Sequence, residues 1–282
     1  MNGRLTYSPH DTNVAAAATG WKLWVYTNYD CNLRCSYCVA KSGPTVARRA
    51  ISLATIRQLV DEAVPLGCDH IFFTGGEPLL LDDIFEMLAY SAARLPTTLL
   101  TNAMLLMQHA PGSPVSRLDR LTEIARHAGD NLIVQVSLDG GRPVDHDAYR
   151  GAGSWQKTVD GIALLQGRGF RVRLASTETP ANSAHLHDIC VFHRGLGIPD
   201  EDHFVRPLAK RGFSREGLEL NRGNLTPEIT VNIDGVFWHP LSTDADMQIS
   251  RSIFPLATSV AYVRQQVVEI ERSGGVPLLT FT

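Results

Sequence analysis

The stretch KLWVYTNYDCNLRCSYCVAKSG, residues 22–43, joins a short apolar run to three closely spaced cysteines, Cys31, Cys35 and Cys38. The run at 23–27 predicts a β-strand, so the cysteines follow directly at its carboxyl end. The spacing C-x-x-x-C-x-x-C allows three thiolates to bind three irons of a cubane cluster, which leaves the fourth iron without a protein ligand. A structural zinc site is the competing interpretation, but it needs four ligands, and no fourth Cys or His lies nearby in the sequence.

The residues between these cysteines narrow the interpretation further. The octapeptide CNLRCSYC, residues 31–38, resembles the signature of the radical S-adenosylmethionine (radical SAM) enzymes. This resemblance implies one [4Fe–4S] cluster on the three cysteines, with SAM bound to its open iron. It further implies a flavodoxin- or ferredoxin-type electron donor, reductive cleavage of SAM to methionine and a 5′-deoxyadenosyl radical, and hydrogen abstraction from the substrate by that radical. A non-catalytic iron–sulfur or zinc binding module, or a partner subunit, is the alternative, but it leaves the GGEP motif described below unexplained.

The composition places the chain among globular proteins with one main core. Its 282 residues, 44% of them hydrophobic, suffice for one sizeable core or for a barrel with a small appendage. The 26 Lys and Arg residues are balanced by 29 Asp and Glu residues, and the formal charge of −3 excludes the global basic field of non-specific nucleic-acid binders. We therefore expect no nucleic-acid partner.

The number of cysteines and the hydropathy of the sequence indicate where in the cell the protein is expected. Only five cysteines occur, three of them clustered, which argues against a disulfide framework and for a reducing compartment. No apolar run reaches the roughly 18 residues that a membrane span needs, and the N-terminal segment lacks the apolar stretch of a secretory signal. These observations predict a cytoplasmic protein without a membrane partner.

Short β-rich runs alternate with helix-like stretches from about residue 21 onward. This alternation predicts an α/β fold of βα units around a parallel sheet, with strands apolar enough to be covered on both faces. Six such units indicate a partial (β/α)6 TIM-like barrel with its chemistry at the carboxyl ends of the strands. In the helix-like stretch 54–67, four residues share one apolar stripe: Ile56, Leu59, Val60 and Ala63. We expect strands at 23–27, 71–74, 97–101, 132–138, 170–176 and 203–206, and further helices at 84–95, 115–127 and 186–197.

The βα alternation stops after residue 211. Residues 228–241 contain two β-like runs joined by Asp234 and Gly235, a strong hairpin signal, and a helix-like stretch follows at 257–272. The hairpin resembles the SPASM and twitch extensions of related enzymes, but no cysteine follows residue 190 to bind an auxiliary cluster. The predicted organisation is an N-terminal arm (1–20), a radical SAM partial barrel (21–211) and a degenerate twitch-like subdomain of β-hairpin plus helix (212–282), with Cys31, Cys35 and Cys38 as the sole metal site.

A glycine-rich turn with the sequence TGGEP, residues 74–78, ends the second predicted strand. Gly75 and Gly76 allow the backbone to approach a ligand closely, and the Glu77 carboxylate can accept hydrogen bonds from an ammonium group. An ordinary strand-ending turn is the competing interpretation. In its position after CNLRCSYC the turn resembles the family's GGEP motif, which implies that Gly75, Gly76, Glu77 and Pro78 bind the amino end of SAM.

Polar residues also follow the later strands. Asn102 resembles part of the family's T-N-G element, although Ala103 replaces the glycine. Residues 137–140 and 146–151 resemble the S-x-D-G and H-D-x-x-R-G elements of radical SAM enzymes that modify peptides, which implies that Ser137 and Arg150 bind the SAM carboxylate. A solvated loop is the alternative for this region. The remaining SAM-binding candidates are Tyr37, which the resemblance places next to the adenine, and Asp139, Ser176, Asn182 and Arg206, the last as a SAM or substrate contact.

Two further residues are weak catalytic candidates. Cys190 could return a hydrogen atom to a substrate radical, although its place in an apolar helical stripe favours a small buried side chain, as at Cys68. His239 stands where the related hairpins carry a cysteine, and it could bind substrate, act as an acid or base, or only decorate the hairpin. Four histidines in helical stretches are expected to face solvent: His127, His185, His187 and His193.

The substrate and the reaction outcome are less defined by the sequence. The S-x-D-G and H-D-x-x-R-G elements favour a peptide or amino-acid-derived substrate, with a small metabolite as the alternative. Because no auxiliary cluster is expected to accept an electron, epimerisation, rearrangement or coupling is favoured over a net dehydrogenation.

Overall fold

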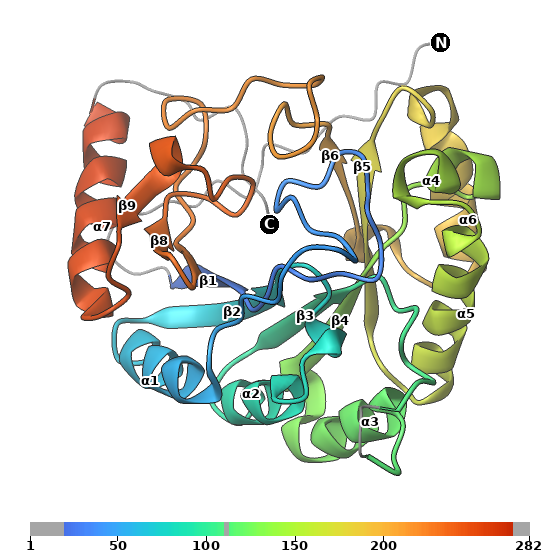
Figure 1. Ribbon diagram of the computed structural model, residues 1–282, viewed down its shortest axis with the longest axis horizontal. Coiled ribbons are helices and arrows are strands. Elements are labelled where there is room, and N and C mark those ends of the chain that lie inside the picture. The colour runs from blue at the N-terminus through green and yellow to red at the C-terminus, as the bar shows by residue number, and fades with distance from the viewer. Residues whose placement is uncertain (1–19, 110–112, 273–282) are drawn as a thin grey trace.

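Six parallel strands and the helices between them form an open, curved sheet in the computed structural model, which describes residues 20–109 and 113–272. The helices cover the outer face of this sheet, and the loop after the first strand lies within its curve (Figure 1). This arrangement confirms the predicted partial barrel. The six strands are β1 (Trp21–Tyr26), β2 (Cys68–Thr74), β3 (Thr97–Thr101), β4 (Leu132–Ser137), β5 (Val172–Glu178) and β6 (His203–Pro207). The helices between them are α1 (Leu53–Ala63), α2 (Ile84–Ala92), α3 (Arg117–Ala128), α4 (Pro143–Arg150), α5 (Ser154–Gly167) and α6 (Leu186–Gly195).

Helix α1 shows how local sequence sets these elements. Its first turn is capped by Ser52, whose hydroxyl accepts a hydrogen bond from Thr55 N at 3.1 Å. The four residues of the predicted apolar stripe are the buried residues of this helix, and they pack into the core against the sheet. Each fully buried aliphatic side chain contributes about 1.5–3 kcal/mol, so the stripe fixes the helix on the outer face.

The two faces of the sheet differ in character. On the outer face, Val25, Phe73 and Leu99 are fully buried beneath the helices. On the inner face, Trp24 and Arg173 are only partly buried, and the Trp24 ring stacks on Phe72 with 4.2 Å between centroids. Within the described residues no helix covers the inner face, because α1 to α6 all lie on the outer one (Figure 1). Phe72 and Thr98 on the inner face are nevertheless buried, so the prediction of strands covered on both faces holds for them and fails only where residues such as Trp24 stay partly open.

The C-terminal strands extend the same sheet. β7 (Thr230–Asn232) pairs in parallel with β1, and β8 (Gly235–Phe237) and β9 (Gln248–Ser250) continue the sheet in antiparallel pairs. The expected terminal helix is present as α7 (Leu256–Arg272), beside α1. The boundary predicted at 211/212 thus falls within one nine-stranded sheet. Residues 1–19 of the predicted N-terminal arm lie outside the described residues.

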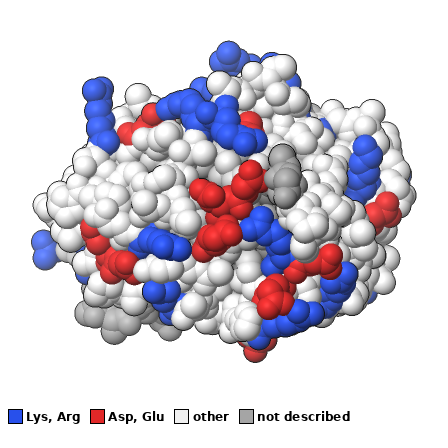
Figure 2. All heavy atoms as spheres, turned by 60° about the horizontal axis from the view of Figure 1, so that its bottom comes forward, with Lys and Arg blue, Asp and Glu red and all other residues white. Residues whose placement is uncertain are grey.

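The surface carries charges of both signs. On the face shown in Figure 2, basic and acidic side chains are interspersed among uncharged ones, in keeping with the formal charge of −3. Within residues 20–109 and 113–272, no helix has the length and apolar character needed to cross a membrane.

Candidate active site

The three clustered cysteines lie on the loop between β1 and α1. Its backbone is closed by a hydrogen bond from Cys31 N to Gly43 O at 3.3 Å. Two sulfurs accept backbone hydrogen bonds: Leu33 N lies 3.4 Å from Cys31 Sγ, and Ser42 N lies 3.5 Å from Cys38 Sγ. Such donors stabilise the negative charge of metal-bound thiolates and tune the metal. The loop therefore supplies backbone donors to two sulfurs that would bind the metal.

The spacing of these thiols fits a cubane cluster better than a single ion. Among the described residues, they do not form a group whose ligand atoms all lie within 4.8 Å of one another. In a cubane, iron and sulfide ions lie between the thiolates, so the sulfurs have to be farther apart than around one ion. Burial raises the pKa of Cys31, and it raises the pKa of Cys35 to about 11. Bound iron favours the thiolate instead, so the loop fits the predicted [4Fe–4S] cluster.

The GGEP turn packs directly on the cysteine loop. Gly76 N donates to Asn28 O at 2.8 Å, and Glu77 N donates to Asp30 O at 3.0 Å. A Cβ on Gly76 would lie 2.0 Å from Asp30 O, and one on Gly75 would lie 2.6 Å from Asn28 O. The glycines therefore allow two backbone segments to approach each other. The buried Asn28 amide, which sequence analysis missed, also donates to Asp30 O at 2.9 Å and Glu77 O at 3.1 Å; its position directly after an apolar strand was the available signal.

We expect Gly76→Ala to destabilise the fold and to weaken iron binding. The added Cβ would clash with the Asp30 carbonyl, and a backbone clash cannot be relieved by turning a side chain. The free energy of unfolding should fall by about 1–3 kcal/mol, as overpacking costs elsewhere, and the iron content after reconstitution should fall with it. Gly167→Ala is the matched control, since nothing lies within 4 Å of its Cβ position. Urea denaturation measures both variants, and a Gly76→Ala protein as stable as this control would contradict the prediction.

Glu77 is buried behind the turn, and hydrogen bonds occupy most of its carboxylate. Oε1 accepts from Leu79 N at 3.1 Å and from Thr101 Oγ1 at 2.8 Å, and Oε2 accepts from Asn102 N at 2.9 Å. Burial raises the pKa of Glu77, and these hydrogen bonds oppose the rise. A carboxylate has about four acceptor positions, so these three contacts leave one on Oε2 for an ammonium group. Pro78 begins the short 3-10 helix that Glu77 caps.

Asn102 connects the end of β3 to the cysteine loop. Its Nδ2 donates to Asn32 Oδ1 at 2.8 Å, and its own Oδ1 accepts from Met104 N at 3.0 Å. Ala103 follows with a φ of 60°, which is the left-handed conformation that glycine adopts without strain. Ala103 therefore occupies a backbone conformation suited to the glycine of the T-N-G element.

We expect Ala103→Gly to stabilise the protein slightly. A left-handed alanine costs about 1 kcal/mol or more, although the variant also loses a buried methyl group, since Ala103 is 2% exposed. The net gain should be about 0.5 kcal/mol, seen as a higher thermal midpoint in calorimetry. As a control, Ala125→Gly inside helix α3 should lower the midpoint, because glycine is about 1 kcal/mol less favourable than alanine in a helix. A midpoint lowered equally by both substitutions would disprove the strain at Ala103.

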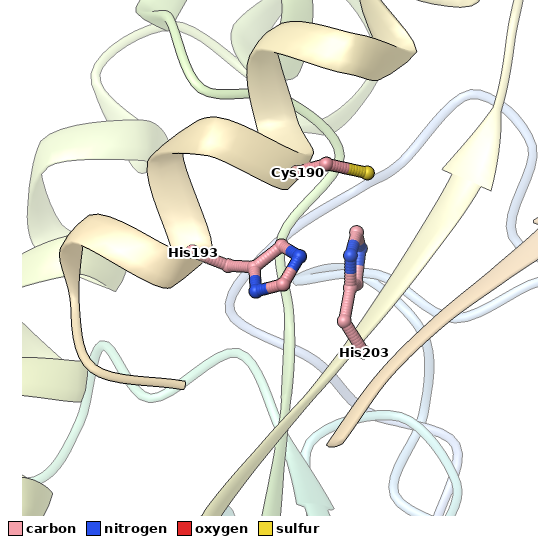
Figure 3. A group of neighbouring side chains, drawn as sticks. All are labelled: Cys190, His193 and His203. Atoms are coloured by element: carbon pink, nitrogen blue, oxygen red, sulfur yellow. The ribbon is translucent and has the colours of Figure 1, made fainter. Parts of the chain in front are cut away.

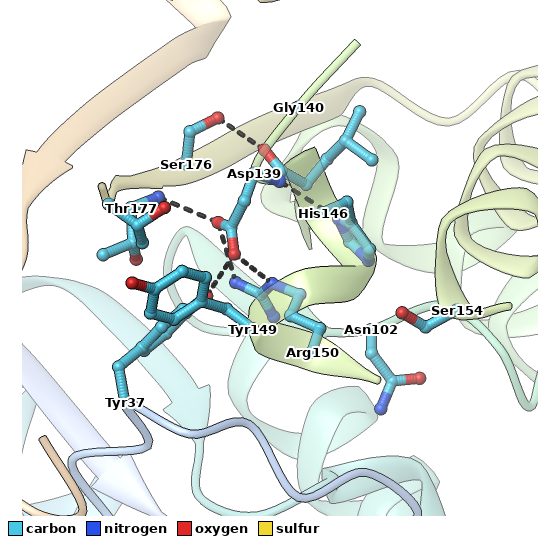
Figure 4. A network of polar contacts seen from close by, with 12 residues as sticks. Tyr37, Asn102, Asp139, Gly140, His146, Tyr149, Arg150, Ser154, Ser176 and Thr177 are labelled. Carbon is cyan, nitrogen blue, oxygen red and sulfur yellow. Dashed lines mark hydrogen bonds and ion pairs between the residues drawn. The ribbon is translucent and has the colours of Figure 1, made fainter. Parts of the chain in front are cut away.

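A buried ion pair lies where β4 meets α4. The Asp139 carboxylate accepts from Arg150 Nε at 2.7 Å and Nη2 at 3.2 Å, from Thr177 N at 2.9 Å, and from the Tyr37 hydroxyl (Figure 4). Burial acts to raise the pKa of Asp139, but the charge of Arg150 overcomes it and lowers that pKa. His146 joins the network, because its Nδ1 accepts from Asp139 N at 3.2 Å. The network ties the cysteine loop, through Tyr37, to the ends of β4 and β5.

Arg150 therefore has fewer available donors than the sequence suggested. Its Nε and Nη2 both face Asp139, so Nη1 is the main donor left for another partner, and the predicted contact with the SAM carboxylate stays a prediction. The guanidinium lies 5.4 Å from the ring centroid of Tyr37. Its charge also opposes the rise that burial causes in the pKa of Cys35. Arg150 and Tyr37 are thus placed together beside the cysteine loop.

Two of the other candidates, Arg206 and Ser137, lie on the inner face of the sheet. Arg206 and Tyr37 line one small cavity together with Thr177, whose Oγ1 accepts from Arg206 Nε at 3.1 Å. Ser137 pairs with Ala175 in the β4–β5 register and therefore lies on the same face as Thr177. Contacts of these side chains with SAM stay predictions.

Asn182 and Ser176 contact backbone groups at the strand ends. Asn182 Nδ2 donates to Asp139 O at 2.6 Å and to Thr177 O at 2.8 Å. Ser176 lies on the outer face of β5, since side chains alternate along a strand, and its hydroxyl donates to Leu138 O. Both side chains brace neighbouring strands, and their predicted part in SAM binding stays a prediction.

His239 does not decorate the hairpin surface. It is fully buried, and its Nδ1 accepts a hydrogen bond from Leu241 N at 3.1 Å. Burial and the nearby charge of Arg206 lower its pKa to about 3, so the ring is neutral at physiological pH. If His239 takes part in catalysis, it does so first as a neutral imidazole, which can accept a proton.

Helix α6 places two residues differently from the sequence prediction. Cys190 is only partly buried, whereas Cys68 is buried as expected. His193 was expected to face solvent but is 1% exposed. It lies four residues after Ile189, the other buried residue of α6, so both point to the same side of the helix. That spacing was the signal in the sequence that indicates a buried histidine.

The fold and the site define a class of protein, an open α/β half-barrel in which a three-cysteine loop packs against glycine-rich and charged strand ends. The chain belongs to the radical SAM superfamily: the family model for this superfamily matches residues 25–180, more than half of the chain. This membership confirms the predicted class of enzyme and its cofactors, SAM and a [4Fe–4S] cluster.

Similar proteins come from several branches of this family. The AdoMet-dependent heme synthase of Nitratidesulfovibrio vulgaris is 28% identical over 169 residues, which cover 59% of this chain and 42% of that protein. Mycofactocin maturase MftC of Mycobacterium tuberculosis is 29% identical over 189 residues, or 66% of this chain and 45% of that protein. The chain thus spans less than half the length of these curated relatives.

Solved structures share the fold. Native anSMEcpe with bound AdoMet and Kp18Cys peptide has a TM-score of 0.63 at 14% identity, covering 89% of this chain and 83% of that chain. Streptococcus suis SuiB bound to S-adenosylmethionine has a TM-score of 0.58 at 17% identity, covering 73% of this chain and 45% of that chain.

Proposed function

We propose that this protein cleaves SAM reductively and uses the resulting 5′-deoxyadenosyl radical to abstract a hydrogen atom from a peptide substrate. The observation that carries the proposal is the buried junction between the cysteine loop and the SAM motifs, in which Glu77 N bonds to Asp30 O and Tyr37 bonds to Asp139. When bound, the [4Fe–4S] cluster supplies the electron for SAM cleavage. A flavodoxin- or ferredoxin-type protein brings that electron, and the unpaired cysteines favour a reducing compartment such as the cytoplasm.

The residues of the chain hold SAM in a fixed orientation. Glu77 Oε2 accepts from the ammonium group, and Arg150 Nη1 donates to the carboxylate. The other hydrogen bonds of Glu77 and Arg150 keep both side chains in place before SAM arrives, so little ordering is needed on binding. Tyr37 lies beside the adenine and is itself held by Asp139. The half-barrel around these groups limits the access of water to the radical.

A charged cavity of about 350 Å³ supports an acidic peptide as the substrate class. It borders the cysteine loop, because Phe213 N, next to the cavity residue Gly212, donates to Cys38 O at 3.1 Å. Four cations and two carboxylates line it: Lys41, Lys210, Arg211, Arg215, Glu219 and Asp244. Three of the cations already pair with carboxylates, so the excess positive charge of the lining is small and an acidic peptide would have to compete with these ion pairs. SuiB was solved bound to its precursor peptide SuiA, and the Bacillus subtilis relative AlbA is named for biosynthesis of the bacteriocin subtilosin. We therefore favour a peptide with acidic residues near the modified position over a neutral metabolite.

Two measurements test the proposal. Calorimetric titration of the anaerobically reconstituted protein with SAM should show binding, and dithionite with SAM should then release 5′-deoxyadenosine. No binding at millimolar SAM would instead support the non-catalytic module.

A separate experiment tests the substrate class. Peptide pools rich in Asp and Glu should raise 5′-deoxyadenosine release over matched pools with Asn and Gln. Equal release with both pools would exclude the acidic peptide while leaving SAM cleavage intact.

A further inference from the structure

A second group of metal-ligating side chains lies away from the cysteine loop. The ligand atoms of Cys190, His193 and His203 all lie within 4.8 Å of one another (Figure 3). Cys190 and His193 lie on α6, and His203 begins β6, the edge strand of the sheet. In the β5–β6 register His203 alternates with Phe204, so it faces the outer side that α6 covers. The group therefore lies behind the sheet and not on its SAM-binding face.

The hydrogen bonds of His193 determine which ring nitrogen is available. His193 Nδ1 lies 2.9 Å from Ile198 O, and a carbonyl oxygen only accepts, so Nδ1 carries the proton. The lone pair is then on Nε2. A backbone carbonyl on the far nitrogen is the usual arrangement for a metal-binding histidine, because it orients the ring and raises its basicity.

The hydrogen bonds of His203 give an equivalent result. The single hydroxyl proton of Ser176 goes to Leu138 O, so Ser176 Oγ accepts from His203 Nε2 at 2.8 Å. The lone pair of His203 is then on Nδ1. Both imidazoles are thus oriented by a second partner.

We propose that Cys190, His193 and His203 bind one Zn²⁺ ion, which links helix α6 to the edge strand β6. One thiolate and two imidazoles suit zinc, whose tetrahedral sites place ligand atoms about 3.5 Å apart. The present spacing of at most 4.8 Å has to shorten when the ion binds. Binding releases the Cys190 thiol proton to solvent as the Zn–S bond forms, with no change of oxidation state.

The fourth position lies on the exposed side of the group. Asp200 Oδ1 is 3.6 Å from His193 Nε2, so this carboxylate is within reach of the ion. Asp200 also forms a two-point ion pair with Arg194, at 2.7 Å for each contact. Either Asp200 or a water molecule completes the tetrahedron, and neither choice alters the three-residue assignment.

Zinc content of the reconstituted full-length protein tests the site. The cluster-loaded chain is treated with ZnCl2, and weakly bound metal is removed with a competing chelator before elemental analysis. We expect about one zinc per chain in the wild type and at least about 100-fold weaker retention in Cys190→Ser and His203→Gln, since each removes a ligand. His187→Gln, an exposed histidine of the same helix, should retain the zinc. Circular dichroism confirms that each variant is folded.

Zinc K-edge X-ray absorption then identifies the ligands in the same sample. We expect one sulfur at about 2.3 Å with nitrogen or oxygen at about 2.0–2.1 Å. A shell dominated by sulfur would place the zinc on the cysteine loop and overturn the proposal. Zinc retained equally by Cys190→Ser and wild type, or by neither, would overturn it as well. These readouts do not depend on SAM cleavage, so the zinc site and the proposed activity can fail separately.

Discussion

Cys35→Ala is expected to lower 5′-deoxyadenosine release by at least about 100-fold, since loss of a mere supporting contact to a metal ligand already costs 10–100-fold. Alanine offers no ligand, so two irons of the cubane would lack a protein thiolate. Cys35 is partly buried on the same loop as Cys31 and Cys38, and Cys38 N donates to its carbonyl at 3.1 Å. Among the described residues, this loop carries no fourth cysteine that could replace it. Iron analysis after anaerobic reconstitution, followed by the dithionite and SAM assay, measures both losses.

Cys68→Ala is the matched control. Cys68 is a buried free thiol at the start of β2, at the opposite end of that strand from the GGEP turn. This variant should keep about four irons per chain and the wild-type release of 5′-deoxyadenosine. Equal release from Cys35→Ala and wild type would exclude the proposed mechanism. Loss in both variants would point to unfolding, which circular dichroism detects.

Strand positions could be predicted from the sequence because buried parallel strands are short apolar runs. The run at 97–101 coincides with β3 (Thr97–Thr101), and each of the other five runs overlaps its strand. The partly open positions of the inner face could not be predicted in this way. Trp24 and Val25 are both apolar, yet their side chains point to opposite faces, and only tertiary packing decides which face the helices cover.

Helices α4 and α5 were not predicted, for a physical reason. The segment PVDHDAYR that forms α4 buries the polar residues Asp145, His146 and Arg150, so an apolar pattern does not mark its buried side. Its junction with α5 is fixed by a side chain: the Asp147 carboxylate accepts from Gly153 N at 2.7 Å and from Trp155 N at 2.8 Å. Such capping stabilises a helix start that periodicity does not reveal.

The site residues could be located by motif, but the directions of their side chains could not. Ser176 and Thr177 are adjacent, and the register of β5 turns Thr177 toward Arg206 and Ser176 toward His203. The partnership of Asp139 with Arg150 likewise depends on how α4 folds back on β4. Motifs therefore predict which strand ends carry the chemistry, whereas the register assigns each side chain to one face.

Asp139→Asn is expected to lower the free energy of unfolding by about 3–5 kcal/mol at neutral pH, the usual cost of leaving a buried charge without its partner. The side chains of Asp139 and Arg150 are 0% and 7% exposed, so water cannot replace the lost carboxylate. The substitution also weakens the hold on Tyr37, so affinity for SAM should fall together with stability. Urea denaturation and calorimetric titration with SAM measure the two effects.

Two comparisons separate the buried charge from general damage. Glu219→Gln breaks the exposed Lys210–Glu219 pair, whose side chains are 45% and 72% exposed, and should cost less than about 1 kcal/mol. Adding Arg150→Met to Asp139→Asn should recover part of the lost stability, because no unpaired charge is then buried.

The pH dependence of stability gives a further test. Arg150 lowers the pKa of Asp139 in the folded state, so the pair stabilises the wild type above the ordinary Asp pKa of about 3.9 and loses this effect as the pH falls below it. The stability difference between wild type and Asp139→Asn should therefore narrow below about pH 4, and a difference that stays constant down to pH 2 would show that the lost charge is not its cause.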